Sequence, residues 1–425
     1  MLRFYTLMWW LALPLVLARL WLRGRQEPGY RQHWGERLGI YGRRAANDGP
    51  LTIWVHAVSV GETRASEPLV EALLKQYPHS RIVLTHMTPT GRATGKSLFG
   101  KHGARLVQSY LPYDIPSLVQ RFIRHFEPRI CILMETEVWP NLIAECGRRK
   151  VPVMLANARL SERSLRKAQR FGRMMRNAAA GISHVAAQTE ADAERIRSLG
   201  APKVDVTGSI KFDVVVPPAV LALGARLRQQ IGLRPVLLCA STREGEEELI
   251  LDAARTAAMP DGWLLLLVPR HPQRFDAVDA MVRGRGLSVQ RRSALETPGA
   301  LVAAETQVLL GDSMGEMFAY YAACDVAFIG GSLQPLGGQN LIEPAALGKP
   351  VLVGQHTFNF AQATEDALAA GGAQRVASAD DLMRTAAALL QDATARETMG
   401  ANALAFANQH RGATARTIAL LPPLA

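Results

Sequence analysis

From residue 51 onward, short apolar runs alternate with longer amphipathic stretches along the chain. The apolar runs, such as Ile53 to Val58 and Ile130 to Met134, have the length of buried strands. The stretches that follow them, including Glu67 to Lys75 and Leu142 to Arg149, mix apolar with charged residues as surface helices do. This alternation predicts an α/β fold with a parallel, doubly wound sheet.

The alternation is interrupted at Pro217 and Pro218 and restarts with the apolar run Val236 to Ala240. A chain of 425 residues also exceeds what one hydrophobic core usually supports. We therefore expect two α/β domains, residues 23–215 and 216–425, joined near residues 210–230. The carboxyl ends of their strands would line a cleft between the two domains.

Residues 1–22 precede this pattern and are mostly apolar. Phe4 to Ala18, about 15 residues, would cover only ~22 Å of a ~30 Å hydrocarbon core as a helix. If Arg19 reaches back to the interface, the span extends to Leu22. No A-x-A-like cleavage site follows, and an Arg-rich flank should stay cytoplasmic. We expect an uncleaved membrane anchor, either spanning the bilayer or lying in its surface; the alternative is a helix buried in the protein.

The chain is basic, with a formal net charge of +12. Such a balance suits nucleic acid, an anionic membrane surface or an anionic substrate. The sequence has no basic run interleaved with aromatics and no nucleic-acid-binding module. The arginines are concentrated between Arg159 and Arg176 and near the N-terminus, at Arg19, Arg23, Arg25, Arg31, Arg37, Arg43 and Arg44. This distribution favours a membrane surface or an anionic lipid over nucleic acid.

The four cysteines are widely separated and form no CxxC pair, which fits a reducing compartment. The sequence also has no HExxH motif and no cluster of His and Cys ligands. We therefore predict no bound metal.

The stretch from Gly330 to Phe360 predicts a strand, a Gly-rich loop, a helix and a second strand. Asn340 and Glu343 stand at the start of the helical part, Leu341 to Leu347. Helix amides there are available to an anionic or sugar-like ligand, and Glu343 is placed to hold hydroxyls. The alternative is a Gly-rich turn with a capping carboxylate.

Polar turns follow the predicted strands of the first half. Glu62 lies just after the first strand, where it can act as a general base or complement a helix N-terminus. Glu135 and Glu137 follow another buried strand, and strand packing does not require two acids there. Lys211 stands near the expected hinge, where it is either half of a surface pair with Asp213 or a ligand for phosphate or carboxylate.

The second half repeats this arrangement in the segments Ser241 to Glu247, Pro269 to His271 and Gly311 to Glu316. Polar or Gly-rich turns after successive strands predict a nucleotide-donor domain. The half has no GxGxxG opening a βαβ unit and no GxxxxGK[ST]. These absences argue against a dehydrogenase and against a P-loop NTPase.

Taken in order, these motifs make the chain resemble the Kdo (3-deoxy-D-manno-octulosonic acid) transferases of lipopolysaccharide synthesis. The matching segments cover nearly the whole length and are YRQHWGERLGIYG, HAVSVGET, MTPTG, YLPYD, METEVWPN, NARLS, GSIKFD, STREGEE, LVPRHP, GDSMGE, GGQNLIEPAA and HTFNF. Two positions depart from the family pattern, because Arg243 replaces the usual histidine and Gln355 replaces a proline.

The resemblance implies a GT-B glycosyltransferase with two Rossmann-like domains, the first binding the acceptor and the second the donor. It implies transfer of Kdo from CMP-Kdo to a lipid A precursor (lipid IVA) at the cytoplasmic face of the inner membrane, without a metal or other cofactor. By motif, Glu62 would be the base of an inverting displacement, and Glu135 and Lys211 would assist the transition state. Glu137 remains an alternative to Glu135. The residues implied in binding CMP are Pro269, Arg270, Met314, Gly315, Glu316, Asn340, Leu341, Ile342 and Glu343.

Two other functions fit the same sequence. The chain could be a GT-B transferase that uses a different nucleotide sugar, or a non-catalytic, membrane-docked scaffold that keeps the GT-B body. The acids Glu62, Glu135 and Glu137 argue against the scaffold. The sequence leaves open the number of Kdo residues added, the acyl pattern of the acceptor and the oligomeric state.

Overall fold

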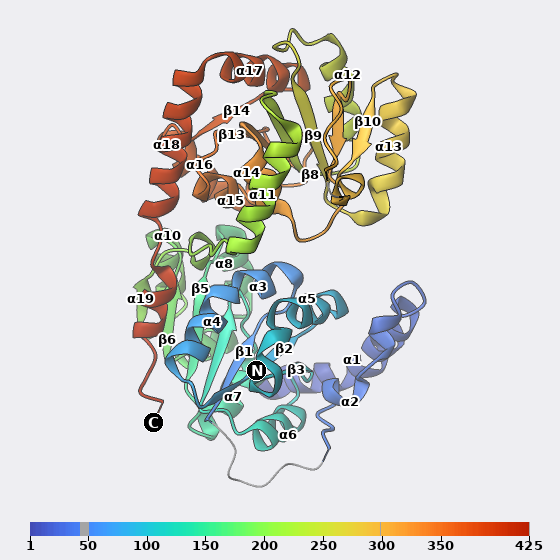
Figure 1. Ribbon diagram of the computed structural model, residues 1–425. Helices are drawn as coiled ribbons and strands as arrows, with labels where there is room; N and C mark the ends of the chain where they lie inside the picture. Colours follow the sequence, from blue (N-terminus) through green and yellow to red (C-terminus); the bar gives the residue numbers. More distant parts are fainter. Residues whose placement is uncertain (43–50, 298, 425) are drawn as a thin grey trace. The chain divides into compact units, whose positions relative to one another are not determined.

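The computed structural model describes residues 1–42, 51–297 and 299–424, and its chain divides into two compact units (Figure 1). Unit 1 comprises Met1–Asp213 and Arg411–Ala425, and unit 2 comprises Val214–His410. Each unit is built on its own parallel sheet. Arg43 and Arg44, two of the arginines near the N-terminus, lie outside the described residues.

Unit 1 contains, in the part of the chain described, a seven-stranded sheet in the order β3-β2-β1-β4-β5-β6-β7, with all neighbours parallel. The strands are β1 (Leu51–His56), β2 (Ser80–His86), β3 (Leu106–Tyr110), β4 (Ile130–Met134), β5 (Val153–Ala158), β6 (His184–Ala187) and β7 (Val204–Val206). The strand order reverses between β1 and β4. In open α/β sheets ligands bind where the order reverses, outside the carboxyl ends of the strands. The loops that follow β1 and β4 therefore mark the expected site.

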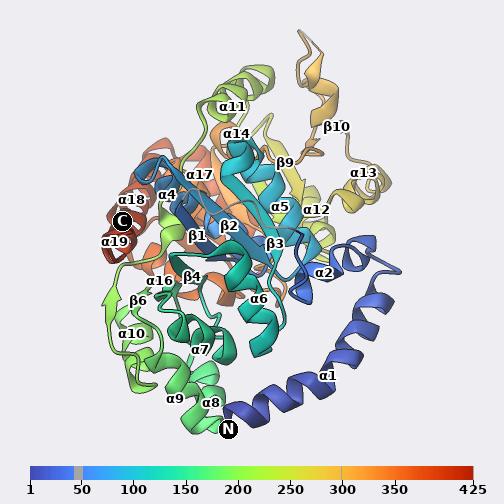
Figure 2. The same ribbon diagram turned by 90° about the horizontal axis from the view of Figure 1, so that it is seen from below.

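The helices of unit 1 cover both faces of this sheet, which is why its central strands are continuously apolar (Figure 2). They are α1 (Leu2–Arg23), α2 (Trp34–Arg37), α3 (Val60–Ala65), α4 (Glu67–Gln76), α5 (Pro89–Phe99), α6 (Pro116–Phe126), α7 (Pro140–Arg148), α8 (Glu162–Arg170), α9 (Gly172–Ala180), α10 (Glu190–Ser198) and α19 (Ala413–Ala419), with 3₁₀ helices η1 (Pro28–Arg31), η2 (Gly100–Arg105) and η3 (Ile210–Phe212). The sequence pattern from Ser164 to Ala178 predicts one helix, and this prediction is wrong. Gly172 takes a φ of +47°, which a continuous α-helix cannot accommodate, so the segment divides into α8 and α9.

The apolar N-terminal segment forms the 22-residue helix α1. Among the described residues, one helix, Leu2–Arg23, is long and apolar enough to cross a membrane. One face of α1 packs on unit 1, where Leu13 and Leu20 are buried against Tyr113, Ile115 and Leu118. The opposite face is an exposed apolar stripe of Phe4, Leu7, Met8, Leu11, Leu15 and Leu22. The predicted alternative of a buried helix therefore describes only one side of α1.

Unit 2 contains, again within the described ranges, a parallel seven-stranded sheet in the order β10-β11-β9-β8-β12-β13-β14. Its strands are β8 (Val236–Thr242), β9 (Leu264–Pro269), β10 (Val289–Arg291), β11 (Val308–Leu310), β12 (Val326–Ile329), β13 (Val351–Val353) and β14 (Ala373–Arg375). The order reverses between β8 and β12. The loops after these two strands are therefore the expected ligand-binding edge of unit 2.

The helices of unit 2 are α11 (Pro218–Ile231), α12 (Glu246–Thr256), α13 (Phe275–Gly284), α14 (Met317–Ala323), α15 (Ile342–Ala346), α16 (Ala361–Ala369), α17 (Ala379–Gln391) and α18 (Ala393–Gln409), with 3₁₀ helices η4 (Pro272–Arg274), η5 (Arg292–Glu296) and η6 (Phe358–Phe360). Pro218, expected only to interrupt the chain, is the first residue of α11, a position that proline tolerates well. The Ala-rich segment from Ala379 to Gln409 is predicted to be helical from its sequence, and it forms two helices that are separated at Asp392. The carboxylate of Asp392 caps α18 by accepting the Ala395 amide at 2.9 Å.

The chain ends in unit 1, although the predicted second domain extended to residue 425. The amides of Gly412 and Thr414 donate to the two carboxylate oxygens of Asp213, at 2.6 and 2.5 Å. The Arg416 guanidinium donates to the Thr207 carbonyl at 2.9 Å. Asp213 therefore anchors the C-terminal helix α19.

Candidate active site

Glu62 lies in the first turn of α3, the short helix that follows the buried strand β1, and not in a turn before a helix as the sequence suggested. Its carboxylate accepts a hydrogen bond from the Val58 amide, which fixes the side chain against the loop between β1 and α3. Burial, together with the nearby charges of Glu137 and Glu135, raises the pKa of Glu62 from 4.5 to about 7, although the hydrogen bond from the Val58 amide acts in the opposite direction. A carboxylate with a pKa near neutrality is suited to accept a proton from a substrate hydroxyl.

Glu135 follows β4 directly and pairs with Lys211. The Lys211 ammonium lies 2.8 Å from the Glu135 Oε1 atom, and both side chains are largely shielded from solvent. Glu135 takes a φ of +57°, an uncommon conformation for a residue other than glycine. Such conformations persist where the surrounding structure holds them, and they are often found at functional sites. The two predicted residues Glu135 and Lys211 are therefore brought together.

Glu137 lies beside this pair but has a different partner. The Trp139 indole Nε1 donates to the Glu137 Oε2 atom at 2.9 Å. Burial raises the pKa of Glu137, the Trp139 hydrogen bond lowers it, and the charge of Glu135 raises it. The lysine thus pairs with Glu135, while Glu137 contributes negative charge near Glu62. This geometry favours Glu135 over Glu137 for the role assigned jointly with Lys211.

Asn157 holds the backbone of the segment that carries Lys211, a role that sequence reasoning missed. Its Oδ1 atom accepts the Ile210 amide at 3.0 Å, which ties the end of β5 to η3. Asn157 is fully buried and takes a φ of +53°. Asparagine tolerates this left-handed conformation better than most residues. The NARLS motif that contains Asn157 was the available signal, but a motif alone does not reveal a contact with η3.

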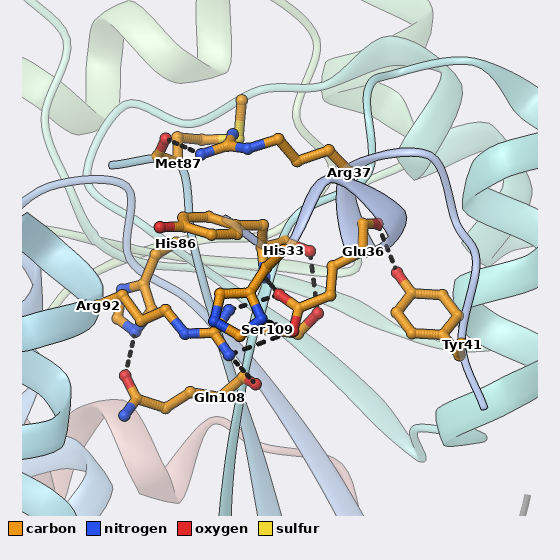
Figure 3. A network of polar contacts seen from close by, with 10 residues as sticks. His33, Glu36, Arg37, Tyr41, His86, Met87, Arg92, Gln108 and Ser109 are labelled. Atoms are coloured by element: carbon orange, nitrogen blue, oxygen red, sulfur yellow. Dashed lines mark hydrogen bonds and ion pairs between the residues drawn. The ribbon is translucent and has the colours of Figure 1, made fainter. Parts of the chain in front are cut away.

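The segment between α1 and β1 is fastened to the same edge of the sheet through Glu36 (Figure 3). Arg92 donates to the two oxygens of the Glu36 carboxylate from both terminal guanidinium nitrogens, Nη1 and Nη2, at 2.5 and 3.1 Å. The Tyr110 amide donates to Glu36 Oε2 at 2.7 Å, and the Tyr41 hydroxyl donates to the Glu36 carbonyl at 3.0 Å. A two-point Arg–carboxylate pair is rigid, so this network fixes α2 against β3 and α5.

Arg37, next to Glu36, leads from this network towards the candidate base. It is 1% exposed, its guanidinium lies over the Tyr110 ring, and it donates to the Met87 carbonyl at 3.0 Å (Figure 3). The Met87 amide in turn donates to the Val58 carbonyl at 3.1 Å. Since the Val58 amide donates to the Glu62 carboxylate, a continuous set of contacts connects Arg37 to Glu62.

Three carboxylates and one ammonium group therefore lie at the carboxyl edge of β1, β4 and β5. This arrangement provides a proton acceptor in Glu62 and a fixed positive charge in Lys211. Within the described residues, no group of three or more His, Cys, Asp or Glu side chains has the arrangement of a metal site.

In unit 2 the corresponding edge is organised by Glu246, the first residue of α12. Its carboxylate accepts the backbone amides of Gly331 at 2.5 Å, Leu333 at 3.0 Å and Arg243 at 2.9 Å. These contacts join the loop after β8 to the Gly-rich loop after β12, at the reversal of the strand order. Arg243, the departure from the family pattern, uses its backbone in this arrangement.

The predicted pair of Asn340 and Glu343 is in direct contact. Asn340 Nδ2 donates to Glu343 Oε1 at 3.0 Å, and Asn340 Oδ1 accepts the Ile342 amide at 3.0 Å. The charges of Glu343 and Arg270 both act on the buried Tyr321 hydroxyl, whose pKa burial raises well above its usual value. The segments after β9 and β12 therefore converge around Tyr321.

The remaining residues predicted to bind the donor differ in which of their groups a ligand can reach. Pro269 ends β9, Met314 is 56% exposed, and Gly315 takes a φ of +81° that allows close backbone approach. Glu316 already pairs with Arg292, whose Nε lies 3.2 Å from Glu316 Oε2. The side chains of Leu341 and Ile342 are both 1% exposed and belong to the core. These last two can therefore offer a ligand only backbone groups.

Comparison with known proteins identifies relatives over almost the entire length. A family model described as 3-deoxy-D-manno-octulosonic-acid transferase (kdotransferase) matches residues 32–214. The chain is 46% identical over 414 residues to the 3-deoxy-D-manno-octulosonic acid transferase of Bordetella pertussis, covering 95% of each chain. It is 40% identical to the enzyme of the same name from Haemophilus influenzae, covering 99% of this chain and 98% of that one.

Solved structures share the architecture at low sequence identity. A glycosyltransferase from Rickettsia africae has a TM-score of 0.58 at 12% identity, covering 88% of this chain and 98% of that one. A UDP-GlcNAc 2-epimerase from Neisseria meningitidis has a TM-score of 0.57 at 16% identity, covering 87% of this chain and 100% of that one. These likenesses support the GT-B-like fold predicted from the sequence.

Proposed function

The chain belongs to the 3-deoxy-D-manno-octulosonic acid (Kdo) transferase family, and we propose that it moves Kdo from CMP-Kdo to a lipid A precursor by an inverting displacement with Glu62 as base. As a member of this family it is a glycosyltransferase of lipopolysaccharide synthesis. The acceptor, the stereochemical course and the residue roles are the parts that we propose.

The observation that supports this proposal best is the environment of Glu62. An acceptor hydroxyl loses its proton as its oxygen attacks the anomeric carbon from the face opposite the CMP leaving group. The base must be ionised before it can take that proton, and its pKa should lie near the working pH. Burial and the charges of Glu137 and Glu135 bring the pKa of Glu62 to about 7, where both conditions are met.

Lys211 and Glu135 act as a unit in this proposal. As the bond between the sugar and the phosphate breaks, negative charge grows on the leaving group and positive charge grows on the sugar ring. Lys211 supplies a fixed cation and Glu135 a fixed anion, held 2.8 Å apart. Groups that are positioned before the reaction stabilise such charges without a cost of reorganisation.

We assign donor binding to the strand ends of unit 2. Arg270 provides positive charge for the phosphate and the carboxylate of CMP-Kdo. The Asn340 side chain donates to the Glu343 carboxylate at 3.0 Å and so orients Glu343 to bind hydroxyl groups of the donor. Gly315 offers a backbone amide, and Glu246 fixes the Gly-rich loop by accepting the Gly331 amide at 2.5 Å. The mechanism as proposed draws its positive charge from Lys211 and Arg270 and uses no metal or other cofactor.

We place the protein at the cytoplasmic face of the inner membrane, held there by α1. The helix packs on unit 1 by one face, so its exposed stripe is free to enter the interfacial region of a bilayer. This packing favours a helix that lies in the membrane surface over one that spans the bilayer, because a spanning helix would leave Tyr113, Ile115 and Leu118 uncovered.

The test is incubation of the purified full-length chain with CMP-Kdo and a tetra-acylated lipid A precursor, followed by mass spectrometry. The proposal predicts product masses raised by whole Kdo units, and saturation counts the additions. Competition by CMP but not UDP would distinguish CMP-Kdo from another nucleotide sugar. An unchanged acceptor mass in a preparation that still binds CMP would refute the proposed acceptor.

A further inference from the structure

A pocket of about 430 Å³ lies at the N-terminal end of α1, where this helix meets α7 and α9. Its volume falls in the range of roughly 300–1,000 Å³ found for ligand pockets. The walls are mainly apolar and include Leu2, Ile143, Ala144 and Met174, with Arg173 and Asn177 as the side chains that can bind polar groups. Figure 2 shows the N-terminus of α1 beside α9, in agreement with the residues that line the pocket.

This pocket is separate from the candidate active site. The described residues that line the pocket do not include Glu62, Glu135, Glu137 or Lys211. An occupant of the pocket is therefore not bound by the groups to which we assign the transfer reaction.

The helix α9, which contributes Arg173 to the pocket, and the preceding helix α8 carry positive charge. They carry six exposed cations, and among the described residues none of these forms an ion pair: Arg163, Arg166, Lys167, Arg170, Arg173 and Arg176. Phe171, between the two helices, is 50% exposed. Exposed cations next to an exposed aromatic are typical of a surface that contacts anionic headgroups.

The apolar stripe of α1 supplies the second part of this surface. Phe4, Leu7 and Leu11 are more than half exposed and lie on the part of α1 nearest the pocket. If this stripe enters the bilayer surface, the pocket at the same end of α1 lies at the depth of the lipid phosphates. The apolar walls of the pocket would then face the acyl chains of a phospholipid, and Arg173 would face its phosphate.

We propose that this pocket binds one anionic glycerophospholipid of the bilayer. Arg173 binds the phosphate, and an acyl chain packs against Ile143, Ala144 and Met174. The inference rests on the proposed location of the protein at a membrane surface. A bilayer lipid fits better than the acceptor glycolipid, because the residues proposed to act on the acceptor are absent from the lining.

Native mass spectrometry of the full-length protein in a non-ionic detergent tests this, with phosphatidylglycerol or phosphatidylcholine of the same acyl chains as the added probe. The wild-type chain should retain one phosphatidylglycerol with about tenfold preference, because the choline cation of phosphatidylcholine offsets its phosphate charge and is repelled by Arg173. Gly147→Leu should fill the pocket, since a Cβ at Gly147 meets no atom within 4 Å. Arg173→Glu removes the phosphate ligand, and Arg163→Glu is the matched control, an equal charge change outside the lining.

Both Gly147→Leu and Arg173→Glu should lose phosphatidylglycerol by about tenfold, and Arg163→Glu should retain it. Both variants should keep wild-type kcat on detergent-dispersed acceptor, so lipid loss is read separately from transfer. Three results would overturn the proposal: equal binding of the two lipids, unchanged binding by Gly147→Leu, or displacement of phosphatidylglycerol by one equivalent of the lipid A precursor. The lipid measurement uses no Kdo donor, so it can be interpreted even if the proposed transfer reaction is not observed.

Discussion

The Lys211 ammonium is 2.8 Å from the Glu135 carboxylate, although the two residues come from distant motifs of the chain. The contact depends on two left-handed residues, Glu135 at the end of β4 and Asn157 near the end of β5. It divides three neighbouring acids into distinct roles: Glu135 is neutralised by a cation, Glu137 is held by Trp139, and Glu62 keeps an elevated pKa. This separation of environments is how one site obtains a proton acceptor near neutral pH.

The rate of transfer should rise with pH through about 7. Burial and the charges of Glu137 and Glu135 raise the pKa of Glu62 to that value, and only the ionised carboxylate accepts a proton. The measurement is kcat from pH 5 to pH 9 at saturating donor and acceptor. A kcat that is constant across this range would contradict the assignment, as would the same ascending limb in Glu62→Gln.

Glu62→Gln should make the protein more stable above pH 7. The pKa of Glu62 is higher in the folded state than in the unfolded state, so between pH 4.5 and about 7 the folded state binds more protons. The folded state therefore loses stability relative to the unfolded state as pH rises through that window. Replacing Glu62 should raise the free energy of unfolding at pH 8 by roughly 1–3 kcal/mol, with little change at pH 4.5. Urea unfolding at the two pH values measures the difference. Lower stability of the variant at pH 8 would show that the acid is not destabilised by its surroundings.

Substitutions of Asn157 should lower turnover by displacing Lys211. Asn157→Gly tolerates the φ of +53° but lacks the acceptor for the Ile210 amide, whereas Asn157→Ala loses both properties. Both should reduce kcat, because an unsatisfied buried amide costs about 1–3 kcal/mol and loosens η3. Asn157→Ala should be less stable than Asn157→Gly by about 1–2 kcal/mol, the cost of the left-handed conformation. Wild-type kcat in Asn157→Gly would show that the hydrogen bond does not position the lysine.

Membrane association should depend on the exposed face of α1. The triple variant Phe4→Gln, Leu11→Gln and Leu15→Gln removes apolar side chains that make no core contact, so it should release the protein from inner-membrane vesicles. Its kcat on detergent-dispersed acceptor should stay near wild type. The control Leu13→Ala acts on the packed face and should cost about 2–5 kcal/mol of stability without releasing the protein. Sedimentation of the triple variant with vesicles at the wild-type level would argue against this anchor.

The two parallel sheets and most of their helices follow from the sequence, because runs such as Ile130–Met134 are apolar enough to be buried on both faces. The failures occur where one residue overrides a local pattern. Gly172 breaks a helix that the periodicity extends, and α5 was not predicted because its two glycines and two threonines are weak helix formers. The return of the C-terminus to unit 1 depends on Asp213 binding two distant amides, which no local pattern encodes.

The candidate site was predictable at the level of motifs and not of partners. Strand ends pointed to Glu62, Glu135 and Glu137, but only the fold shows that Lys211 pairs with Glu135 and that Trp139 binds Glu137. Leu341 and Ile342 were included because they belong to a matching motif, whereas their side chains pack in the core. Residue type and spacing identify such segments, and side-chain orientation requires the tertiary contacts.

The measurement that tests the central claim most directly is the kcat of Kdo transfer by Glu62→Gln. CMP-Kdo and a tetra-acylated lipid A precursor are the substrates, and product is detected by mass spectrometry. If Glu62 is the base, kcat should fall about 10²–10⁴-fold, while the fold and the affinity for CMP stay as in the wild type. A kcat within a few-fold of wild type would show that another group accepts the proton.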